Sequence, residues 1–590
     1  MLLNKKISPK SLKTMSDKQL RHLCGEIRDY LITTVSKNGG HLASNLGTVE
    51  LTVALHKVFD SPTDKIVFDV GHQCYTHKIL TGRYEEFKTL RTENGIGGFP
   101  RAAESPHDAF LGGHSGIAVS AALGIAEAMR LSGSDGKTVA VVGDGAFTDG
   151  GTYEGMNNAG RSGANLIVIL NDNEMSISKN TGAVAAYLTG LRSGRRYHTA
   201  KTNVKTFLQK NPVGTAVSGA VSVTKKFVRN AIYSNTLFEN IGFEYYGVVD
   251  GHNLKELTEV LELAKLIDRP CLIHVKTKKG KGYKPAERNA GEYHGVTGVV
   301  IPRNPETRTG TKVFGTAVAE FAAKDEKIVL VSAAMKYATG CNYFNDLFPD
   351  RFYDCGIAEA HAVTFSAGLA SQGLLPVFAV YSTFSQRCFD RLIHDCAIEN
   401  RHVVLAIDRA GFVGEDGETH QGLYDVAMLS AVPNMTVFSP ATADELRECL
   451  RVALYDVCGP VAVRYPRGQM KVGNHVGDVI ESNGDYRLFG SGKKALNITY
   501  GRLACELRLQ ERDLLQLIKI APLSQKAVLT AMAYSDILFY EEGSSRGGVG
   551  EALLLELVRR GWKGKYDVKG VTGFVPAADA ITQLNNLILS

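Results

Sequence analysis

"KTVAVVGDGA", residues 137–146, joins an uninterrupted run of apolar β-forming residues to a glycine-rich polar end. A second stretch of the same kind, "NLIVILNDN" at 165–173, follows in the sequence. Strands that are apolar along their whole length are typical of parallel sheets, because helices cover both faces of such sheets. Ligands bind at the carboxyl ends of these strands. The two stretches therefore predict a doubly wound α/β domain with a ligand site at one edge of its sheet.

The rest of the first third of the chain fits the same domain. A helical pattern covers about 16–36, and the strand "PCLIHVKT" at 270–277 closes the unit. Between them, residues 181–235 read as a basic, irregular insertion. A connector rich in Pro, Gly, Thr and Arg follows at 295–312.

Two further groups of strands repeat this architecture. They are predicted at 327–333, 375–381 and 401–408, and then at 495–501 and 536–543 with a helix at 549–561. A Gly- and Asn-rich connector at about 469–494 separates the two groups. The sequence therefore predicts an α/β fold of three doubly wound domains in series, at 1–300, 309–470 and a shortened 490–590.

Composition places the chain among ordinary globular proteins. Its 590 residues are 44% hydrophobic and 22% charged, with a net charge of +6 and no arginine-rich tract that would indicate nucleic acid binding. The ten cysteines form no C-x-x-C pair, and the spacing of Cys388 and Cys396 matches no zinc site, so free thiols are expected. The first 15 residues lack the apolar segment of a secretory signal, and no apolar run is long enough to cross a bilayer. We therefore expect a cytoplasmic protein without membrane partners.

The polar ends of the first two strands predict a metal site. Gly143 and Gly145 flank Asp144, and glycines at such a strand end let the backbone approach a phosphate. An aspartate beside a phosphate is repulsive unless a cation lies between them, which favours Mg²⁺. Asn173 ends the next strand, so its amide oxygen, the Asp144 carboxylate and the backbone carbonyl of Met175 are the expected ligands. The alternative is that both side chains cap neighbouring loops.

A glutamate stands at an unusual place in "DCGIAEAHAVTFSAGLA", residues 354–370. Glu359 begins a helix pattern of small apolar residues, where burying a carboxylate costs free energy unless a partner compensates it. One alternative is that backbone N–H groups at the helix N-terminus satisfy it. His361, inside the same pattern, is interpreted as a core histidine.

Several motifs together resemble the 1-deoxy-D-xylulose-5-phosphate synthases, a family of transketolase-like thiamine diphosphate enzymes. They lie between about 35 and 470 and are "SKNGGHLASNLGTVELTVALH", "FDVGHQCYTHKILTGR", "GGHSG", "LNDNEMSIS", "IAEAHAVTFSAGLA", "YSTFSQRCFDRLIHD", "IDRAGFVGEDGETHQG" and "VRYPRG". "EEGSSRGGVGEALL" at 541–554 is similar more loosely. The chain departs from the family at Ala360, usually glutamine, at Gly573, usually aspartate, and in a tail that looks shortened after "GFVP".

The resemblance implies a reaction and its cofactors. Pyruvate would lose CO₂ and condense with D-glyceraldehyde 3-phosphate to give 1-deoxy-D-xylulose 5-phosphate, a precursor of isoprenoids, thiamine and pyridoxal. Thiamine diphosphate and Mg²⁺ would be the cofactors, and the enzyme would be a homodimer. Glu359 would hydrogen-bond the aminopyrimidine ring and so promote loss of the proton from the thiazolium C2. The first domain would bind the diphosphate and the second domain of the same chain the pyrimidine.

The resemblance also implies which residues form the site. Contacts to the cofactor would come from His72, Gly113, His114, Ser115, Gly145, Ala146, Asn173, Tyr283, Glu359 and Phe384. Protons would be transferred by histidines in polar, glycine-rich loops, namely His41, His72, His294 and His420. The second substrate would be bound by Tyr381, Arg409, Asp416 and Arg467. Taken singly, Phe384 could equally be core, and either arginine could form a surface ion pair.

Two other functions remain open at this point. A transketolase shares the fold and the cofactor motifs but transfers a two-carbon ketol unit. A catalytically silent relative that acts as a scaffold or sensor is suggested by Ala360 and the shortened tail.

Overall fold

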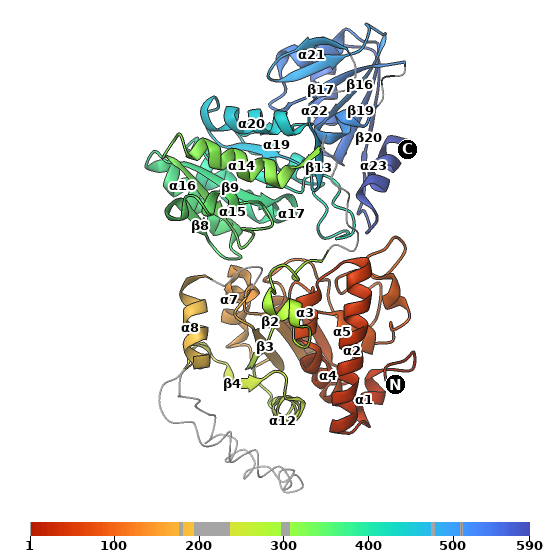
Figure 1. Ribbon diagram of the computed structural model, residues 1–590, viewed down its shortest axis with the longest axis vertical. Helices are drawn as coiled ribbons and strands as arrows, with labels where there is room; N and C mark the ends of the chain where they lie inside the picture. The colour runs from red at the N-terminus through yellow and green to blue at the C-terminus, as the bar shows by residue number, and fades with distance from the viewer. Residues whose placement is uncertain are drawn as a thin grey trace. The chain divides into compact units, whose positions relative to one another are not determined.

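The computed structural model describes residues 2–175, 181–193, 236–296, 307–473, 478–507, 509 and 511–589. The chain forms two compact units, residues 1–300 and 301–590 (Figure 1). None of the helices within these described ranges combines the length and the apolar character that a membrane span requires.

The first unit is built on a five-stranded parallel sheet in the order β1-β2-β3-β5-β4. Its strands are β1 (Lys65–Phe68), β2 (Thr138–Gly143), β3 (Leu166–Asp172), β4 (Glu244–Asp250) and β5 (Cys271–Lys276). The predicted strands at 137–146, 165–173 and 270–277 are thereby confirmed. Gly143 pairs with Asn171, so β2 and β3 end side by side.

Alternate strand residues of this sheet belong to two different cores, one on each face. Val139 and Val141 pack with α2, α4 and α12, whereas Ala140 and Val142 pack with α6 and α7. Figure 1 accordingly shows β2 and β3 between α7 on one side and α2 and α4 on the other. The helices of the unit are α1 (Pro9–Lys13), α2 (Asp17–Asn38), α3 (Leu42–Gly47), α4 (Val49–Val58), α5 (Tyr75–Leu80), α6 (Ala118–Leu131), α7 (Gly150–Ala159), α8 (Gly182–Ser193), α11 (Leu237–Asn240), α12 (Leu254–Lys265) and α13 (Lys284–Arg288).

The prediction of an irregular insertion from 181 is wrong for its first part, which forms α8. Val184, Tyr187, Leu188 and Leu191 follow a helical spacing and pack on the α6–α7 core. Residues 194–235 of the predicted insertion lie outside the described residues.

The second unit contains a seven-stranded sheet in the order β18-β11-β12-β10-β9-β7-β8, in which only β18 is antiparallel. The strands are β7 (Ile328–Ser332), β8 (Phe352–Asp354), β9 (Leu375–Tyr381), β10 (Val404–Asp408), β11 (Thr436–Phe438), β12 (Val461–Arg464) and β18 (Lys519–Ala521). Helices around it are α14 (Gly310–Ala322), α15 (Asn342–Asn345), α16 (Glu359–Ser371), α17 (Ser382–Ser385), α18 (Phe389–Arg391), α19 (Asp425–Ser430) and α20 (Ala443–Tyr455).

A second sheet of this unit has the order β14-β15-β17-β16-β19-β20 and is parallel from β17 to β20. It comprises β14 (Val479–Ser482), β15 (Tyr486–Phe489), β16 (Ala495–Tyr500), β17 (Asp513–Leu517), β19 (Asp536–Ser544) and β20 (Lys565–Val571), with α21 (Gln525–Met532), α22 (Val549–Arg559) and α23 (Ala580–Leu589). The predicted connector at 469–494 therefore contains strands. Its β13 (Gln469–Lys471) also pairs with β6 (Thr307–Thr309).

The two sheets of the second unit share one hydrophobic core. Strand β18, which follows β17 in the chain, leaves the C-terminal sheet and pairs with β11 of the seven-stranded sheet. Val331 and Phe378 from one sheet and Tyr486 and Leu515 from the other belong to the same cluster of buried residues. The C-terminal sheet is thus packed against, and strand-paired with, the sheet before it.

Candidate active site

The ends of β2 and β3 bring Asp144 and Asn173 together. Asp144 is 2% exposed, and its carboxylate accepts hydrogen bonds from the backbone N–H groups of Gly145 (3.1 Å) and Asn173 (3.2 Å). The Asn173 side-chain oxygen accepts the N–H of Met175 at 3.2 Å. The predicted metal ligands therefore lie in the two loops that follow adjacent strand ends. Their oxygen atoms are suited to a hard divalent cation.

The electrostatics of this edge favour a cation. Burial, and secondly the charge of Asp172, raise the pKa of Asp144 to about 7. The buried Lys279 lies close enough to interact with Asp144, and burial lowers the pKa of this lysine to about 8. Because Lys279 does not fully offset the burial of Asp144 and the charge of Asp172, a divalent cation fits this site. Lys279 belongs to the basic segment 276–284, "KTKKGKGYK", yet it is only 6% exposed.

A buried chain of polar groups fixes Asp172 behind Asp144. The second carboxylate oxygen of Asp172 lies 2.8 Å from Nε2 of His274, and the other ring nitrogen lies 3.0 Å from the Tyr245 hydroxyl. The first oxygen accepts the N–H of Glu174 at 3.3 Å. Asp172 is therefore held in one orientation next to the predicted metal ligand.

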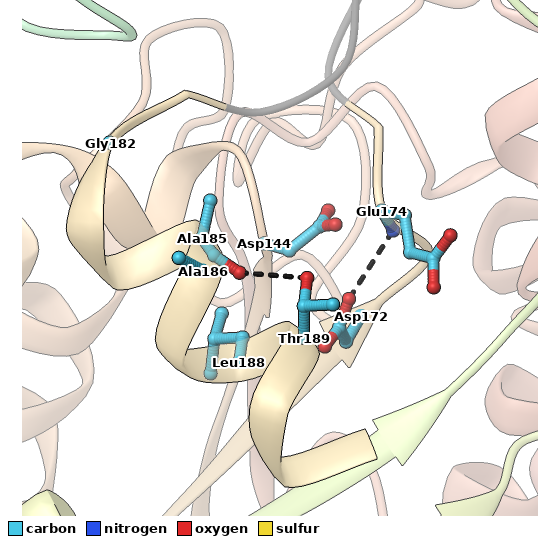
Figure 2. A pocket seen from close by; sticks show the side chains of 8 residues that line it. All are labelled: Asp144, Asp172, Glu174, Gly182, Ala185, Ala186, Leu188 and Thr189. Atoms are coloured by element: carbon cyan, nitrogen blue, oxygen red, sulfur yellow. Dashed lines mark hydrogen bonds between the residues drawn. The ribbon is translucent and has the colours of Figure 1, made fainter. Parts of the chain in front are cut away.

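A cavity of about 220 Å³ opens beside these acids. Figure 2 shows Asp144, Asp172 and Glu174 on one side of it and residues of α8 on the other. The α8 side is formed by small and apolar side chains and Thr189, whose hydroxyl donates to the Ala185 carbonyl at 2.9 Å. Helix α8 thus closes one side of a polar cavity at the end of the sheet.

The loop "GGHSG", which contains Gly113, His114 and Ser115, is held by two aspartates that the sequence analysis did not single out. Asp69 accepts the backbone N–H groups of Gly116 (2.9 Å) and Ala118 (2.8 Å). Asp149 accepts the Ser115 hydroxyl at 2.8 Å.

Gly116 has φ +73°, and a Cβ there would lie 2.3 Å from an Asp149 oxygen, so this position requires glycine. The predicted cofactor loop is therefore rigidly anchored.

Three of the predicted histidines form a cluster in the first unit. The ring centroids of His41, His72 and His294 are 5.4 Å apart in every pair. Burial, and then Lys279, keep the pKa of His294 well below its ordinary value, so this imidazole is neutral at pH 7. The Ser44 hydroxyl lies 3.4 Å from Nδ1 of His294.

Asn45 joins the two segments that supply this cluster. Its side-chain amide is fully buried and donates to the carbonyl oxygens of His41 (2.6 Å) and His72 (2.7 Å), while its oxygen accepts the N–H of Tyr75 (2.9 Å). Asn45 lies within the quoted "HLASNLG" motif, but nothing in its residue type indicates contacts 27 and 30 positions away.

The remaining predicted residues of the first unit occupy the same loops. Gly145 and Ala146 directly follow Asp144, and Ala146 is buried. Tyr283 precedes α13, and its ring packs edge-on against Tyr293 at 5.8 Å. The N–H of Gly280 donates to Ala43 O at 2.8 Å, which ties this segment to α3.

In the second unit, Glu359 begins α16 and is 4% exposed. Its Oε2 lies 3.6 Å from a guanidinium nitrogen of Arg387, a residue that the sequence analysis did not select. The buried carboxylate is thus compensated in part by a neighbouring cation, as its burial cost requires. His361, two residues further, is exposed rather than a core residue, so that prediction is wrong.

Residues predicted for the substrate, the cofactor and proton transfer gather around Tyr381, which ends β9. Phe384 stacks on Tyr381 at 5.6 Å, and His420 packs edge-on against Phe384 at the same distance. The Arg409 guanidinium lies 3.8 Å above the Tyr381 ring. Arg409 has φ +61° at the end of β10. Four predicted residues therefore form one cluster of stacked groups.

Arg467 lies against the acidic loop that contains Asp416. Its guanidinium contacts the Val413 carbonyl (2.6 Å), Glu415 (3.0 Å) and Asp416 (3.2 Å). Arg467 therefore forms an ion pair, as the alternative interpretation stated. One of its two partners, Asp416, is itself a predicted substrate residue. Asp144 and the histidine cluster belong to the first unit, whereas Glu359 and these substrate residues belong to the second.

Comparison with known proteins agrees with this fold. Residues 3–277 match the family model of 1-deoxy-D-xylulose-5-phosphate synthase, and residues 306–472 match that of the transketolase pyrimidine-binding domain. Together with the parallel sheets, these matches define a transketolase-like α/β enzyme.

Three proteins named 1-deoxy-D-xylulose-5-phosphate synthase are among the relatives. The protein of Desulfitobacterium hafniense is 43% identical over 573 residues, covering 94% of this chain and 90% of the relative. The protein of Natranaerobius thermophilus is 45% identical, covering 93% of this chain and 90% of the relative. The protein of Thermomicrobium roseum is 50% identical, covering 79% of this chain and 75% of the relative. The chain belongs to the 1-deoxy-D-xylulose-5-phosphate synthase family, as the sequence motifs predicted.

Proposed function

We propose that this chain condenses pyruvate with D-glyceraldehyde 3-phosphate, releasing CO₂ and 1-deoxy-D-xylulose 5-phosphate, with thiamine diphosphate and Mg²⁺ as cofactors. The observation that carries the proposal is the buried Asp144 beside Asn173 at neighbouring strand ends, in a chain of this family. Burial and the neighbouring Asp172 raise the pKa of Asp144, and a divalent cation at this place would stabilise its ionised form.

The first unit would hold the diphosphate end of the cofactor. Asp144, the Asn173 side chain and the Met175 carbonyl would bind Mg²⁺, and the diphosphate would bind to the ion. The loop of Gly113, His114 and Ser115, with His72, Gly145, Ala146 and Tyr283, would complete the contacts. Asp69 and Asp149 keep that loop in place through the hydrogen bonds described above.

The second unit would hold the pyrimidine end. When bound, thiamine diphosphate supplies a nucleophilic carbon and an electron sink for decarboxylation of a 2-keto acid. The Glu359 carboxyl would hold or release a proton at the pyrimidine nitrogen, and Arg387 stabilises its charge when the proton is absent. Phe384, backed by Tyr381, would stack on the ring.

Protons and phosphate would be handled by the loop residues. Because His294 is neutral, the cluster of His41, His72 and His294 can accept a proton from a substrate hydroxyl and return it to a developing alkoxide. His420 would act in the same way from the second unit. Arg409, Arg467, Tyr381 and Asp416 would bind the phosphorylated aldehyde through charged hydrogen bonds.

We also propose that the protein is a homodimer, and a cytoplasmic location stays a prediction of the sequence. Exposed apolar side chains on elements around the seven-stranded sheet support an interface, because burial against a second copy would remove their apolar surface from water. They are Tyr337, Tyr343, Leu347, Tyr353 and Ile398.

The test is release of labelled CO₂ from the carboxyl carbon of pyruvate by the purified protein with Mg²⁺ and thiamine diphosphate. The proposal predicts that release depends on added D-glyceraldehyde 3-phosphate and that Glu359→Gln lowers its rate at least about 100-fold. A transketolase would instead transfer a ketol unit between sugar phosphates without CO₂, and a silent relative would do neither. Either result would refute the proposed reaction.

A further inference from the structure

Residues 411–422 form a loop that leaves the seven-stranded sheet and returns to it. The N–H of Gly411 donates to Gly422 O at 2.7 Å, and the N–H of Gly422 donates back to Gly411 O at 2.8 Å. This pair closes the loop at its base. The loop contains Asp416 and His420, which the proposed function assigns to substrate binding and proton transfer.

Two side chains from the C-terminal sheet hold the loop at its first residue after this base. The N–H of Phe412 donates to Oε1 of Glu542 at 2.9 Å, and the Phe412 carbonyl accepts Nη2 of Arg502 at 2.9 Å. Glu542 lies on β19, and Arg502 follows β16. Arg502 also binds both carboxylate oxygens of Glu542 through Nε, at 2.9 and 3.1 Å. The ion pair thus engages both hydrogen-bonding groups of one backbone residue.

The approach of Glu542 to the loop is close and buried. Glu542 is 4% exposed. Gly411 has φ +79°, and a Cβ there would lie 2.1 Å from Oε1 of Glu542. A glycine is therefore required for the loop to reach the ion pair. The Arg502 side chain is 16% exposed, so both charges are largely removed from water. This costs free energy that apolar packing would not, which indicates a role for the pair other than filling space.

A second contact from the C-terminal part reaches the other end of the loop. The Gln421 side chain accepts the N–H of Val413 at 2.7 Å and contacts Gln583 of α23 at 3.4 Å. Gln583 in turn donates to Pro576 O at 2.8 Å. The C-terminal domain therefore contacts the loop near both of its ends.

We propose that Glu542 and Arg502 are positioning residues for the aldehyde-phosphate substrate: they fix the loop that places Asp416 and His420. The C-terminal domain contributes to the active site through this ion pair, without itself supplying a group to the reaction. This inference rests on the proposed function for the identity of the substrate, but the contact itself can be tested without it.

The first measurement is hydrogen exchange of the 411–422 amides in the full-length protein without substrate. Glu542→Ala removes the acceptor of the Phe412 N–H, and Arg502→Lys removes the planar donor to the Phe412 carbonyl. Each should speed exchange in this segment by about tenfold, because each exchange event needs only local opening. Lysine retains the charge of Arg502 but cannot bridge Glu542 and the Phe412 carbonyl at once. The control is Arg512→Gln, which breaks a bidentate pair with Asp536 (3.0 and 2.7 Å) on the same sheet.

The second measurement is steady-state kinetics with each variant. We expect KM for D-glyceraldehyde 3-phosphate to rise about tenfold, because uniform substrate binding is lost, while KM for pyruvate and kcat change less than threefold. The Arg512→Gln control should leave both KM values unchanged.

Unchanged exchange at 411–422, or equal changes in Arg512→Gln, would overturn the inference. So would a fall in kcat without a rise in this KM. Should the wild-type protein lack the synthase reaction, the proposed function fails, and the exchange measurement still decides whether the ion pair holds the loop. Should the Glu542 variant not fold, Arg502→Lys, which keeps the charge, decides both measurements.

Discussion

Replacing Asn45 by alanine should destabilise the first unit selectively. The Asn45 side chain is fully buried and makes three hydrogen bonds, to the carbonyls of His41 and His72 and from the N–H of Tyr75. Alanine would leave all three backbone groups buried without this partner. The two histidine segments would also lose their link to each other.

The size of the effect follows from these three groups. A buried polar group left unsatisfied costs roughly 1–3 kcal/mol, and a water molecule entering the space of the lost amide recovers part of this cost. We therefore expect the free energy of unfolding of the first unit to fall by about 3–5 kcal/mol, a large share of the stability of a typical domain. Asn158→Ala is the control, because Asn158 makes one exposed hydrogen bond, to Glu154 O at 2.8 Å.

The chain offers a way to assign the effect to one unit. Its single tryptophan, Trp562, lies in the second unit, so tryptophan fluorescence follows unfolding of that unit alone. In urea, Asn45→Ala should shift the circular dichroism transition of the first unit and leave the Trp562 transition in place. A loss no larger than that of Asn158→Ala, or an equal shift of the Trp562 signal, would refute the reasoning.

Three further predictions concern the charged groups. The folded-state pKa of Asp144, raised to about 7, means that its protonation stabilises the cofactor-free protein below about pH 4 and that this contribution is lost as pH rises through 7. Asp144→Asn should thus raise the melting temperature more at pH 8 than at pH 5, and calorimetry should show no Mg²⁺-dependent cofactor binding by this variant. An equal rise in melting temperature at both pH values would contradict the reasoning. Glu359→Gln should lower kcat at least about 100-fold but change the cofactor Kd, from calorimetry, far less; a normal kcat would exclude the proton role. Arg409→Lys loses the planar group stacked 3.8 Å above Tyr381, and KM for D-glyceraldehyde 3-phosphate should rise about tenfold in initial-rate assays; an unchanged KM would remove Arg409 from the site.

The placement of Asp144 beside Asn173 was predictable because sheet geometry leaves little freedom at the strand ends. Two wholly apolar strands must be parallel and buried, so their ends meet, and Gly143 does pair with Asn171. The motifs located the glycine-rich loop and the histidines in the same way. In each case a local pattern carried the information.

The supporting residues were not predictable, because their partners are distant in the chain. Asp69 binds N–H groups 47 and 49 positions away, and Asn45 bonds across 27 and 30. Aspartate and asparagine occur in every loop, so residue type alone does not reveal such contacts. The burial of Lys279 was not predictable for a related reason: a run of lysines indicates solvent exposure, and only the fold shows which of them is buried.

The error at His361 has a different origin. Helix α16 consists mainly of small and apolar residues on all sides, so its sequence does not reveal which side faces the core. The structure buries Glu359, Ala362, Val363, Ser366 and Ala367 and leaves His361 exposed. By contrast, α8 does carry a helical spacing of apolar residues, but its glycines and threonine favoured the prediction of an irregular segment.

The crossing of β18 has a consequence for how this protein can be cut or recombined. A fragment that ends before residue 478 would lack β18, so β11 would become an open edge strand, the kind of surface that pairs with other chains and aggregates. A chimera that imports a foreign C-terminal domain would have to bring a strand matching β11 as well. The seven-stranded sheet and the C-terminal sheet should therefore be exchanged together in a chimera, and the junction should not be placed between them.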